Sequence, residues 1–569
     1  MILLSLACVS PSIPSGRADV AGGEADSAAP TLVPGGDGTE EDPPDPSDTV
    51  FDVGVIHHIS LVMAAEDWAD IQTNPWSEAW HTATFEWVSG TDGTVEDVGP
   101  VGVRAFGAGS EIATKPALKI SFDKFVPGQR WRTLEQLKLD NSSQDAGFMN
   151  ERLGTSVLRD MALPAARTGW AEVSVNGSAA GFFVALEPID DRFLRRWYAD
   201  ADGPLYGMVS GYYSQGLNPF PAGYTDPFIW YDTQTSVESD GSDLIEATRL
   251  LAEGTDEEVD TAIDLDEFTR VSVARSVMGG IDTFSADGNN YYLYSDRGRL
   301  SQIAWDLDAD LGYPWAFSNA FTVDPRQPWV TSPWSHNPVT GAAYTDPVLS
   351  RHLAMGADPD AIVDEMLAGP FAYAKIDAEI VASADVIRDA VNRDVLGYGP
   401  SFDPRISDLR MFVHERASAL AGFDVADCAE PDDGGWPVSA LSPAGTVGWG
   451  ELLIDKTYWG PGFSVRGEHY CRGVFAHAPS DVSITVPVGA DTVTGRVGIQ
   501  DWVQVCGNGV AFEIWQGGVQ LWSSGIVANY AAAVDIGSVA VTPGSVHLVV
   551  TPNGEYSCDT AAWLDVRVR

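Results

Sequence analysis

Hydrophobic and polar residues follow regular patterns over most of the chain. Residues 101–125 (VGVRAFGAGSEIATKPALKISFDKF) alternate around a glycine turn, which predicts two strands. Residues 147–163 have hydrophobic side chains at helical spacing and are followed by Pro164, so we expect a helix that ends there. Residues 171–190 contain Asn176-Gly177, the dipeptide that most favours a tight hairpin turn.

The pattern continues with further helices and a second hairpin. We predict helices over residues 190–199 and 266–280, a hairpin over 291–305, and several helices between 357 and 422. Beyond Cys428 the chain becomes rich in Gly, Val and Thr in short alternating runs, which are typical of an all-β domain.

Length and composition divide the chain into domains. Its 569 residues exceed the roughly 250–300 residues over which one hydrophobic core usually grows. Residues 9–50 are rich in Pro, Gly, Asp and Glu, so we predict a disordered linker there. The expected fold class is α+β, with a mixed domain over residues 51–424 and a β-sandwich of jelly-roll type over 434–569.

Charge and the N-terminal residues narrow the class of protein. The chain has 81 acidic and 33 basic residues and a formal net charge of −48, which argues against nucleic-acid binding. Residues 1–8 (MILLSLAC) resemble a bacterial lipoprotein signal with Cys8 as the lipidated residue. Because the sequence has no later apolar run of roughly 18–20 residues, we expect an exported or anchored monomer without a membrane-spanning segment.

Carboxylates and carboxamides cluster around the second hairpin. Asp282 precedes Asn289 and Asn290, and Asp306 follows the hairpin. In a protein-kinase-like fold these parts come in the same order: an Asp orients the acceptor hydroxyl, and an Asn and a second Asp hold magnesium. We therefore predict Asp282 as the catalytic residue and Asn289 or Asn290, with Asp306, as metal ligands.

Four segments also resemble the spore-coat protein H (CotH) kinase family. They are LEQLKLDNSSQDAGFMNERLGTSVLRDMALPA, VSVNGSAAGFFVALEPIDDRFL, GGIDTFSADGNNYYLY and IAWDLDADLG. The resemblance implies an atypical protein kinase that uses ATP with Mg²⁺ or Mn²⁺ to phosphorylate Ser or Thr of extracytoplasmic proteins. It implies that Asp308 assists Asp306 at the metal and that Lys115 or Lys119 reaches the ATP phosphates.

The same resemblance suggests further nucleotide contacts. Glu187 would lie at the nucleotide edge, and Glu151 would be the partner of the lysine. Where family members usually have an Arg-Gly turn near the phosphates, this chain has Phe106 before Gly107, with Arg104 two positions earlier. The lost arginine puts the activity in doubt more than the fold.

The C-terminal region resembles the NPCBM carbohydrate-binding module. The most specific segments are RGEHYCRGVFAHAPS and VGIQDW. The resemblance implies binding of a cell-wall or matrix carbohydrate, and Trp502, His477 and Asp559 are the candidate contacts. We expect Trp449 and Trp563 to lie in the core.

Apart from Cys8, all the cysteines lie in the last quarter of the chain. An even number in one region of an exported protein indicates disulfides rather than a metal site. In NPCBM-type modules the loop after VGIQDW lies close to the loop before the last tryptophan-containing strand. The resemblance therefore pairs Cys506 with Cys558, and leaves Cys428 with Cys471.

Two other functions compete with the exported kinase. A catalytically inactive kinase-like fold could serve as a surface adhesin or scaffold, which the Phe106 position and the C-terminal module favour. Glycoside hydrolysis by Asp306 and Asp308 is disfavoured, because two acids on one strand face lack an opposed partner across a sugar.

Overall fold

The computed structural model describes residues 45–569 with gaps. The gaps are residues 78, 108–111, 210–214, 221–225, 236, 313–324, 327, 329–330, 337–340, 422–434, 458–459, 466–467, 501–508, 529–530 and 555–558. In the described part of the chain, no helix is long and apolar enough to cross a membrane.

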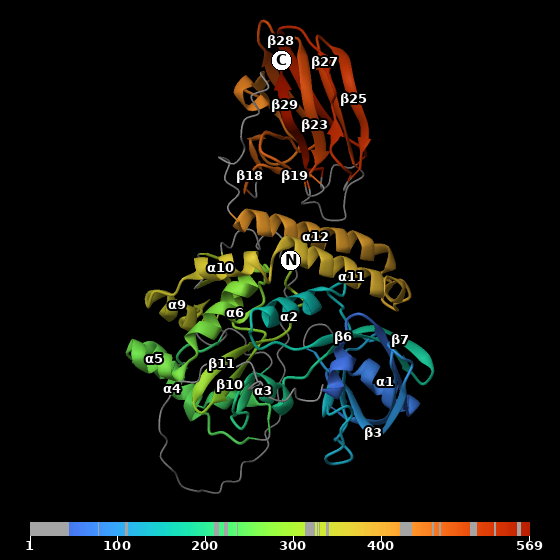
Figure 1. Ribbon diagram of the computed structural model, residues 1–569, viewed down its shortest axis with the longest axis vertical. Helices are drawn as coiled ribbons and strands as arrows, with labels where there is room; N and C mark the ends of the chain where they lie inside the picture. The colour runs from blue at the N-terminus through green and yellow to red at the C-terminus, as the bar shows by residue number, and fades with distance from the viewer. Residues whose placement is uncertain are drawn as a thin grey trace, which may run out of the picture.

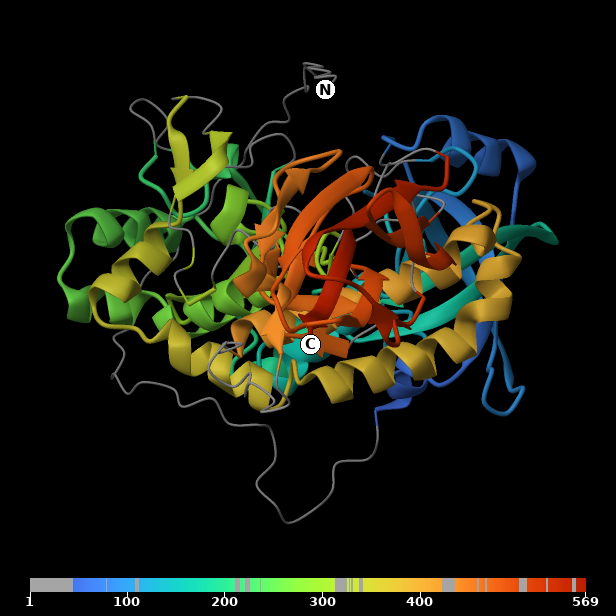
Figure 2. The same ribbon diagram turned by 90° about the horizontal axis from the view of Figure 1, so that it is seen from above.

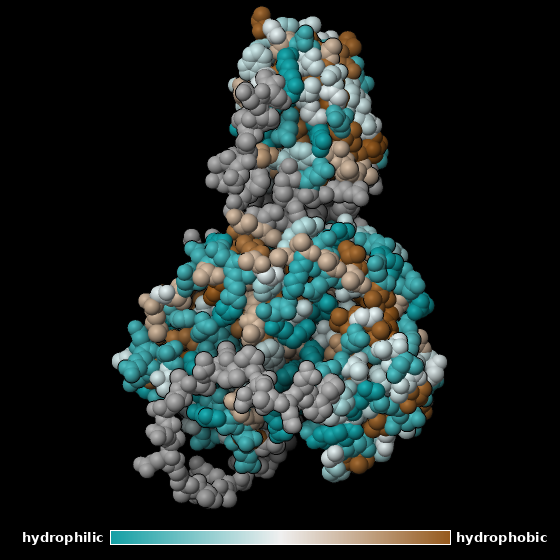
Figure 3. All heavy atoms as spheres, viewed as in Figure 1, coloured by the Kyte–Doolittle hydropathy of each residue, from teal (hydrophilic) through white to brown (hydrophobic). Residues whose placement is uncertain are grey.

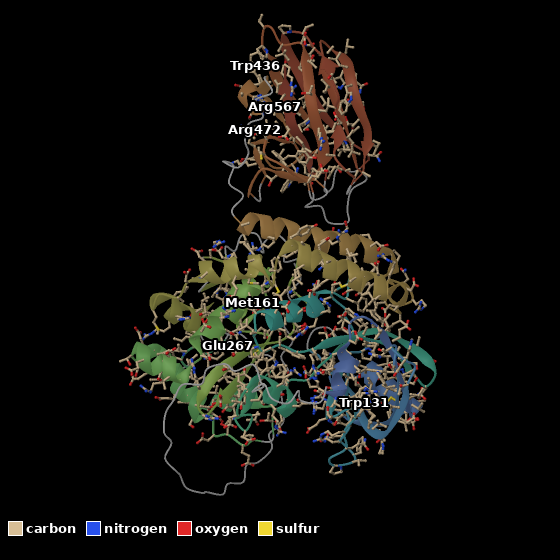
Figure 4. The ribbon with its side chains drawn as sticks, in the orientation of Figure 1. Trp131, Met161, Glu267, Trp436, Arg472 and Arg567 are labelled. Carbon is tan, nitrogen blue, oxygen red and sulfur yellow. The ribbon has the colours of Figure 1, made fainter. Side chains whose placement is uncertain are left out.

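The N-terminal region contains a closed barrel with the strand order β1-β2-β3-β4-β5-β7-β6 (Figure 1). β1 closes it by pairing with β2 on one side and, in parallel, with β6 on the other. Every second strand residue points inward, and hydrophobic side chains fill the interior, including Trp131, which is labelled in Figure 4. The elements are η1 (Pro46–Phe51), β1 (Ile56–Met63), α1 (Ala65–Thr73), β2 (His81–Val88), β3 (Val95–Ala105), β4 (Leu118–Ser121), β5 (Gln136–Asp140), β6 (Thr168–Val175) and β7 (Ser178–Leu186).

A second sheet with the order β11-β10-β8-β9 lies beside a group of helices. Helix α2 contacts β6 of the barrel, and it also contacts α6 and α11. It therefore connects the barrel to the helical part of the domain. The elements are α2 (Asn150–Asp160), α3 (Asp191–Trp197), β8 (Leu205–Met208), η2 (Pro227–Ile229), β9 (Tyr231–Thr233), α4 (Ser242–Glu253), α5 (Asp256–Ala262), α6 (Leu265–Val277), α7 (Phe284–Asp287), β10 (Tyr291–Asp296) and β11 (Arg299–Ala304).

Helices α9 to α12 follow in the described part of this domain. The buried side chains of α10, α11 and α12 join those of α2 and α6 in one hydrophobic core, and α11 and α12 lie side by side in both ribbon views (Figures 1 and 2). The elements are β12 (Thr331–His336), β13 (Ala343–Thr345), α9 (Pro347–Ala354), α10 (Pro359–Ala368), α11 (Tyr373–Asn392) and α12 (Gly399–Leu420).

The C-terminal region is a β-sandwich with its own apolar core. One sheet has the order β16-β21-β29-β23-β26, with β14 and β27 attached, and the other has the order β15-β22-β28-β24-β25. The elements are β14 (Trp436–Pro437), η4 (Val438–Leu441), β15 (Ala444–Thr446), β16 (Leu453–Ile454), β17 (Lys456–Thr457), β18 (Gly460–Pro461), β19 (Phe463–Val465), β20 (Glu468–Tyr470), β21 (Gly473–Phe475), β22 (Ser480–Val486), β23 (Thr492–Ile499), β24 (Val510–Gln516), β25 (Val519–Val527), β26 (Val534–Asp535), β27 (Val539–Ala540), β28 (Gly544–Pro552) and β29 (Ala561–Val568).

The predicted mixture of helices and sheets and the C-terminal sandwich are confirmed. Asn176 and Gly177 both have positive φ, 51° and 76°, as the predicted tight turn requires. The structured region begins earlier than predicted, because η1 starts at Pro46, inside the segment expected to be a disordered linker. The kinase-like arrangement and the lipidation of Cys8, which lies outside the described residues, stay predictions.

Candidate functional site

A buried arginine of α6 holds the segment that follows β11. The Nε and Nη2 atoms of Arg275 donate to the two carboxylate oxygens of Asp310 at 3.1 and 2.8 Å. The same guanidinium donates to the carbonyl oxygens of Trp305 and Asp306, each at 3.1 Å. Because the side chain spans both sides of the segment, it fixes the backbone on which Asp306 lies.

Asp306 adopts a left-handed conformation with φ 54°, which is uncommon for a non-glycine residue. Burial raises the pKa of its carboxyl group to about 7, and the charges of Asp140 and Asp282 add to this effect. Arg275 and Lys138 oppose the shift. The structure therefore brings the predicted residues Asp282 and Asp306 together, and adds Asp140 from β5.

Asp308 and Glu151 lie close to these residues. We call Asp140, Glu151, Asp282, Asp306 and Asp308 the acid cluster. Burial raises the pKa of Asp308 well above its usual value, and the charges of Asp306, Asp140 and Glu151 contribute. Burial and Asp306 likewise raise the pKa of Glu151, on α2, to about 8. The Glu151 carboxylate also accepts a hydrogen bond from the backbone N–H of Leu307, directly after Asp306.

The predicted catalytic loop is assembled by two asparagines. The Asn289 side-chain amide donates to the Asp282 carboxylate at 2.7 Å, and the Asn290 amide donates to the Asp282 carbonyl at 3.2 Å. The Trp305 N–H donates to the Asn290 carbonyl at 3.1 Å, which joins this loop to the start of the Asp306 segment. Asn289 therefore holds the Asp282 carboxylate and Asn290 holds its backbone, and the role of either asparagine as a metal ligand stays a prediction.

Lys138 of β5 is a lysine near Asp306 that the sequence analysis did not predict. Its Nζ lies 3.8 Å from the centre of the Trp305 ring and 5.7 Å from that of Phe106. Burial lowers its pKa to about 8, and the charge of Asp306 partly offsets this effect. The signal was present in LKLD, since alternation along a strand places Lys138 and Asp140 on one face.

Three cations form a row across neighbouring barrel strands. Arg104 of β3 is the register partner of Lys119 of β4, and Lys119 is the register partner of Lys138 of β5. Directly opposed residues point to the same side of a sheet, so the three side chains share one face. We call Arg104, Lys119 and Lys138 the cation row. Two of its members were predicted from the sequence.

Lys115 lies elsewhere, in a closed ion pair. Its side chain is fully buried, its Nζ lies 3.0 Å from the Asp394 carboxylate, and the rings of Phe148 and Phe183 flank it at 4.7 and 4.9 Å. A Cβ atom at Gly181 would lie 2.8 Å from the Lys115 side chain, so the pair is tightly enclosed. Asp394 is the ion-pair partner of this lysine. Burial raises the pKa of Asp140, and the charge of Lys115 partly offsets this effect.

Glu187 and Gly107 lie at the edges of the barrel. The buried Glu187 carboxylate accepts hydrogen bonds from Arg167 and Arg196. Burial would raise its pKa, but these two arginines outweigh that effect and lower it. Gly107 has φ 123° and is exposed beyond the end of β3. Neither residue belongs to the acid cluster.

The candidate carbohydrate contacts of the C-terminal sandwich are mostly buried. His477 is 4% exposed and Asp559 is fully buried. Trp563 lies in the core as predicted, but the prediction for Trp449 is wrong, because its ring is 56% exposed and lies 5.7 Å from that of His477. Trp449 lies in the connection between β15 and β16. Trp502 lies outside the described residues.

Cys471 is disulfide-bonded. Cys428, Cys506 and Cys558 lie outside the described residues, so the proposed pairing stays a prediction.

The acid cluster fits a divalent cation bound together with phosphate. Burial first, and then the charges of neighbouring carboxylates, raise the pKa values of Asp306 and Asp308, and a bound cation would favour their ionised form. In the described parts of the chain, no three His, Cys, Asp or Glu side chains are already placed to hold a metal alone. Mg²⁺ usually needs only one or two carboxylates, because water and substrate phosphate supply its other ligands.

Family models match both parts of the chain. The family described as CotH kinase protein matches residues 103–420, and the NPCBM/NEW2 domain matches residues 437–569. Among curated proteins, alpha-1,3-galactosidase B of Akkermansia muciniphila is 30% identical over 121 residues, and the inner spore coat protein H of Bacillus subtilis is 22% identical over 204 residues. These alignments cover 21% and 33% of this chain, and the chain spans 15% and 53% of the two relatives.

Solved structures are similar to part of the chain. They include CBM51-2 and INT domains of Clostridium perfringens ZmpB in complex with GlcNAc, with 21% identity, and CBM51 of C. perfringens GH95 in complex with methyl-galactose, with 19% identity. Both have a TM-score of 0.23 and cover 24% of this chain, and they are matched over 32% and 100% of their own length.

Proposed function

Because the chain belongs to the CotH kinase protein family, we propose that its N-terminal domain transfers the γ-phosphoryl group of ATP to a Ser or Thr hydroxyl of an extracytoplasmic protein. The observation that carries this proposal is the cation row, Arg104, Lys119 and Lys138, and the charge of Asp306 acts on the pKa of its last member. Three cations beside a cluster of carboxylates suit a ligand that brings both phosphates and a metal ion.

The cation row binds the ATP phosphates in this proposal. The chain carries a formal charge of −48, so a polyphosphate would be repelled by most of its surface. Three adjacent basic side chains reverse the field locally. Lys138 takes the role that the sequence analysis gave to Lys115, because Lys115 is neutralised by Asp394.

A divalent metal would be held by Asp306 and Asp308, and when bound it supplies positive charge to the phosphate oxygens. The protein residues do the remaining work. Glu151 receives the Leu307 N–H and so holds the segment between the two aspartates in place. The Arg275 guanidinium fixes the same segment from the other side.

Asp282 is the residue we propose to accept the proton of the attacking hydroxyl. Asn289 donates to one of its carboxylate oxygens, and Asp287, whose pKa is raised by burial and by the Asp282 charge, also forms a side-chain hydrogen bond with Asp282. The hydroxyl oxygen forms the new bond to phosphorus as the bond to the ADP oxygen breaks, and the proton moves to Asp282. This division of roles needs no covalent enzyme intermediate.

The C-terminal module is proposed to bind a cell-wall or matrix carbohydrate outside the cytoplasm. The match to the NPCBM/NEW2 domain and the exposed Trp449 ring support this proposal, since aromatic faces stack on sugars. A glycan array with residues 434–569, which contain their own apolar core, tests it. We expect weak retention of a polymer, and a clear loss for Trp449→Ala.

The decisive test of the kinase uses the full chain, labelled ATP, Mn²⁺ and casein. We expect phosphate transfer by the native protein, at least about 100-fold less by Lys138→Ala, and no change for Lys456→Ala, an exposed lysine of the sandwich. Calorimetric binding of ATP with Mn²⁺ but no transfer to any protein acceptor would favour the inactive scaffold. If neither binding nor transfer occurs, the kinase proposal fails.

A further inference from the structure

The segment that carries the proposed metal ligands has a left-handed residue at each end. Asp306 has φ 54° and Leu311 has φ 55°, and neither residue is glycine. Such a backbone persists only where its surroundings hold it, because residues other than glycine rarely adopt this conformation. We call residues 306–311 the Asp306 segment. Arg275 of α6 holds its first end, since it donates to the Asp306 carbonyl oxygen at 3.1 Å.

Asn150, the first residue of α2, holds the second half of the Asp306 segment. Its side-chain amide donates to the carbonyl oxygens of Asp308 and Asp310 at 2.6 and 2.9 Å. Hydrophilic side chains cover much of the face shown in Figure 3, whereas the side chain of Asn150 is fully buried. Buried polar groups are usually satisfied by hydrogen bonds. Here the two bonds fix two peptide groups of the segment at once.

Arg405 of α12 orients Asn150. Its Nη2 atom donates to the Oδ1 atom of Asn150 at 2.7 Å and to the carbonyl oxygen of Leu311 at 3.2 Å. A guanidinium can only donate, and a backbone carbonyl can only accept. The oxygen of Asn150 therefore faces the arginine, and its nitrogen faces the Asp306 segment. An Asp at this position would direct a carboxylate oxygen at two carbonyl oxygens.

The same arginine is tied to the start of α2. Its Nε atom lies 3.4 Å from the carboxylate of Asp145, which accepts hydrogen bonds from the backbone N–H groups of Met149 and Asn150 at 2.6 and 2.9 Å. A Cβ atom at Gly147 would lie 3.0 Å from the Arg405 side chain. One guanidinium therefore joins α12, the start of α2 and the end of the Asp306 segment.

Helix α2 contacts the Asp306 segment at two further positions. The Glu151 carboxylate accepts a hydrogen bond from the Leu307 N–H. A Cβ atom at Gly154 would lie 2.7 Å from the Leu307 side chain, so the helix and the segment are closely packed. Residues 150, 151 and 154 lie within about one turn of the helix. The position of this turn therefore determines where the segment lies.

We propose that Asn150 and Arg405 are positioning residues, which hold the Asp306 segment in the conformation that lets Asp306 and Asp308 share one cation. Asn150 makes the contacts with the segment, and Arg405 acts through Asn150. The proposal rests on the proposed kinase function for its purpose, but the contacts do not depend on phosphate transfer. Because the amide is neutral, it fixes the backbone without adding a charge that would compete with the cation.

The first experiment follows the Asp306 segment alone, by hydrogen–deuterium exchange of the metal-free full chain. The reporters are the backbone N–H groups of Leu307 and Leu311, which are both hydrogen-bonded. We expect Asn150→Ala to speed exchange of these groups about tenfold, and Arg405→Ala to act in the same direction. Peptides from the β-sandwich should exchange as in the native protein.

Arg152→Ala is the matched control. Arg152 is a buried residue of the same helix, but its ion pair is with Glu379 of α11. The variant should lose stability and leave exchange of the Asp306 segment unchanged. Unchanged exchange in Asn150→Ala, or an equal increase in Arg152→Ala, would overturn the proposal. If Asn150→Ala does not fold, Asn150→Ser replaces it, because a hydroxyl can donate to only one of the two carbonyl oxygens, and exchange should rise about threefold.

The second experiment measures the metal. Electron paramagnetic resonance detects free Mn²⁺ in the presence of the full chain and a non-hydrolysable ATP analogue. We expect Asn150→Ala to weaken Mn²⁺ binding about 10- to 100-fold, as is typical of residues that orient metal ligands, and Arg152→Ala to bind it normally. Because Arg405 acts through Asn150, the double variant Asn150→Ala/Arg405→Ala should bind Mn²⁺ no more weakly than Asn150→Ala. Additive losses would contradict this relay.

The transfer assay separates the positioning role from the kinase proposal. Asn150→Ala should raise the Mn²⁺ concentration that gives the half-maximal rate, and excess Mn²⁺ should restore part of kcat. A loss of kcat that Mn²⁺ does not relieve would contradict positioning. If the native protein neither binds Mn²⁺ nor transfers phosphate, the proposed function fails, whereas the exchange experiment still decides whether Asn150 and Arg405 hold the segment.

Discussion

Lys115 and Lys138 belong to the same barrel and share a lowered pKa of about 8, for the same reason, burial. Their surroundings differ. Lys115 is enclosed by two aromatic rings and one carboxylate at 3.0 Å. Lys138 is the last residue of the cation row, and the charge of Asp306, a member of the acid cluster, acts on its pKa. We therefore interpret the Lys115–Asp394 ion pair as a stabilising contact of the fold. The carboxylates near Lys138 outnumber the nearby cations, and we propose that a ligand supplies the remaining positive charge.

The largest effect expected from this difference is on Asp306. Asp306→Asn should reduce phosphate transfer by about 1,000-fold or more, because it removes charge from the metal site. The folded-state pKa of about 7 lies above the unfolded value of 3.8, so the ionised group destabilises the fold progressively as pH rises between these values. Without metal at pH 7.5, the variant should therefore be more stable, by about 1–2 kcal/mol after solvent screening.

Thermal unfolding and transfer assays on the same preparation measure both quantities. A variant that loses activity and also melts at a lower temperature would contradict the assignment of Asp306 to an uncompensated cluster.

The next effect separates the two lysines. Lys115→Met should destabilise the fold by about 3 kcal/mol, because Asp394 would stay buried without its partner. Lys138→Met should leave the melting temperature nearly unchanged and weaken ATP binding about 30-fold. Urea unfolding and calorimetry test these outcomes, and a reversal between the two variants would exchange their roles.

A smaller effect is the pH dependence of metal binding. A proton occupies Asp306 below its pKa of about 7, so Mn²⁺ must displace it in acid. We expect Mn²⁺ to raise the melting temperature by about 3 °C at pH 8 and by much less at pH 5.5. An equal shift at both pH values, or an equal shift in Asp306→Asn, would place the metal elsewhere.

The smallest effect concerns Glu267 of α6, which is labelled in Figure 4. Burial and the charge of Asp264 raise its pKa well above the usual value. The folded state thus binds a proton that the unfolded state releases above pH 4.5, and stability falls as pH rises from there. Glu267→Gln should add about 1 kcal/mol at pH 8 and little at pH 4. Equal stabilisation at both pH values would argue for a packing effect.

Local patterns in the sequence predicted most elements of the fold. Asn176-Gly177 predicted the hairpin of β6 and β7, and helical spacing predicted α2 and α6. The hairpin prediction over residues 291–305 matches β10 and β11, and Asp306 lies just beyond it. These signals are local, since each depends on residues within one turn or one strand. The start of η1 was missed because its order comes from distant arginines, such as Arg167, which pairs with Asp48.

The site was predicted only in part, because local patterns indicate the order of its residues but not their distant contacts. The order of Asp282, the two asparagines and Asp306 could be read along the chain, and the hydrogen bonds among them agree with it. The choice between lysines depended on strand register and on which carboxylate each would meet. Lys115 has Asp394 nearly 280 residues away as its partner, and no local pattern indicates that contact.

Arg275 holds its segment through the Asp310 carboxylate and also through backbone carbonyls of residues 305 and 306. Every amino acid supplies a carbonyl, so this support does not depend on which side chains stand at those two positions. The hydrogen bonds from Arg275 to the backbone can therefore persist when the side chain of residue 306, the proposed metal ligand, is changed. A library that varies position 306 should recover folded proteins most often with Gly, Asn or Asp, because the backbone there is left-handed, whereas position 275 accepts little change.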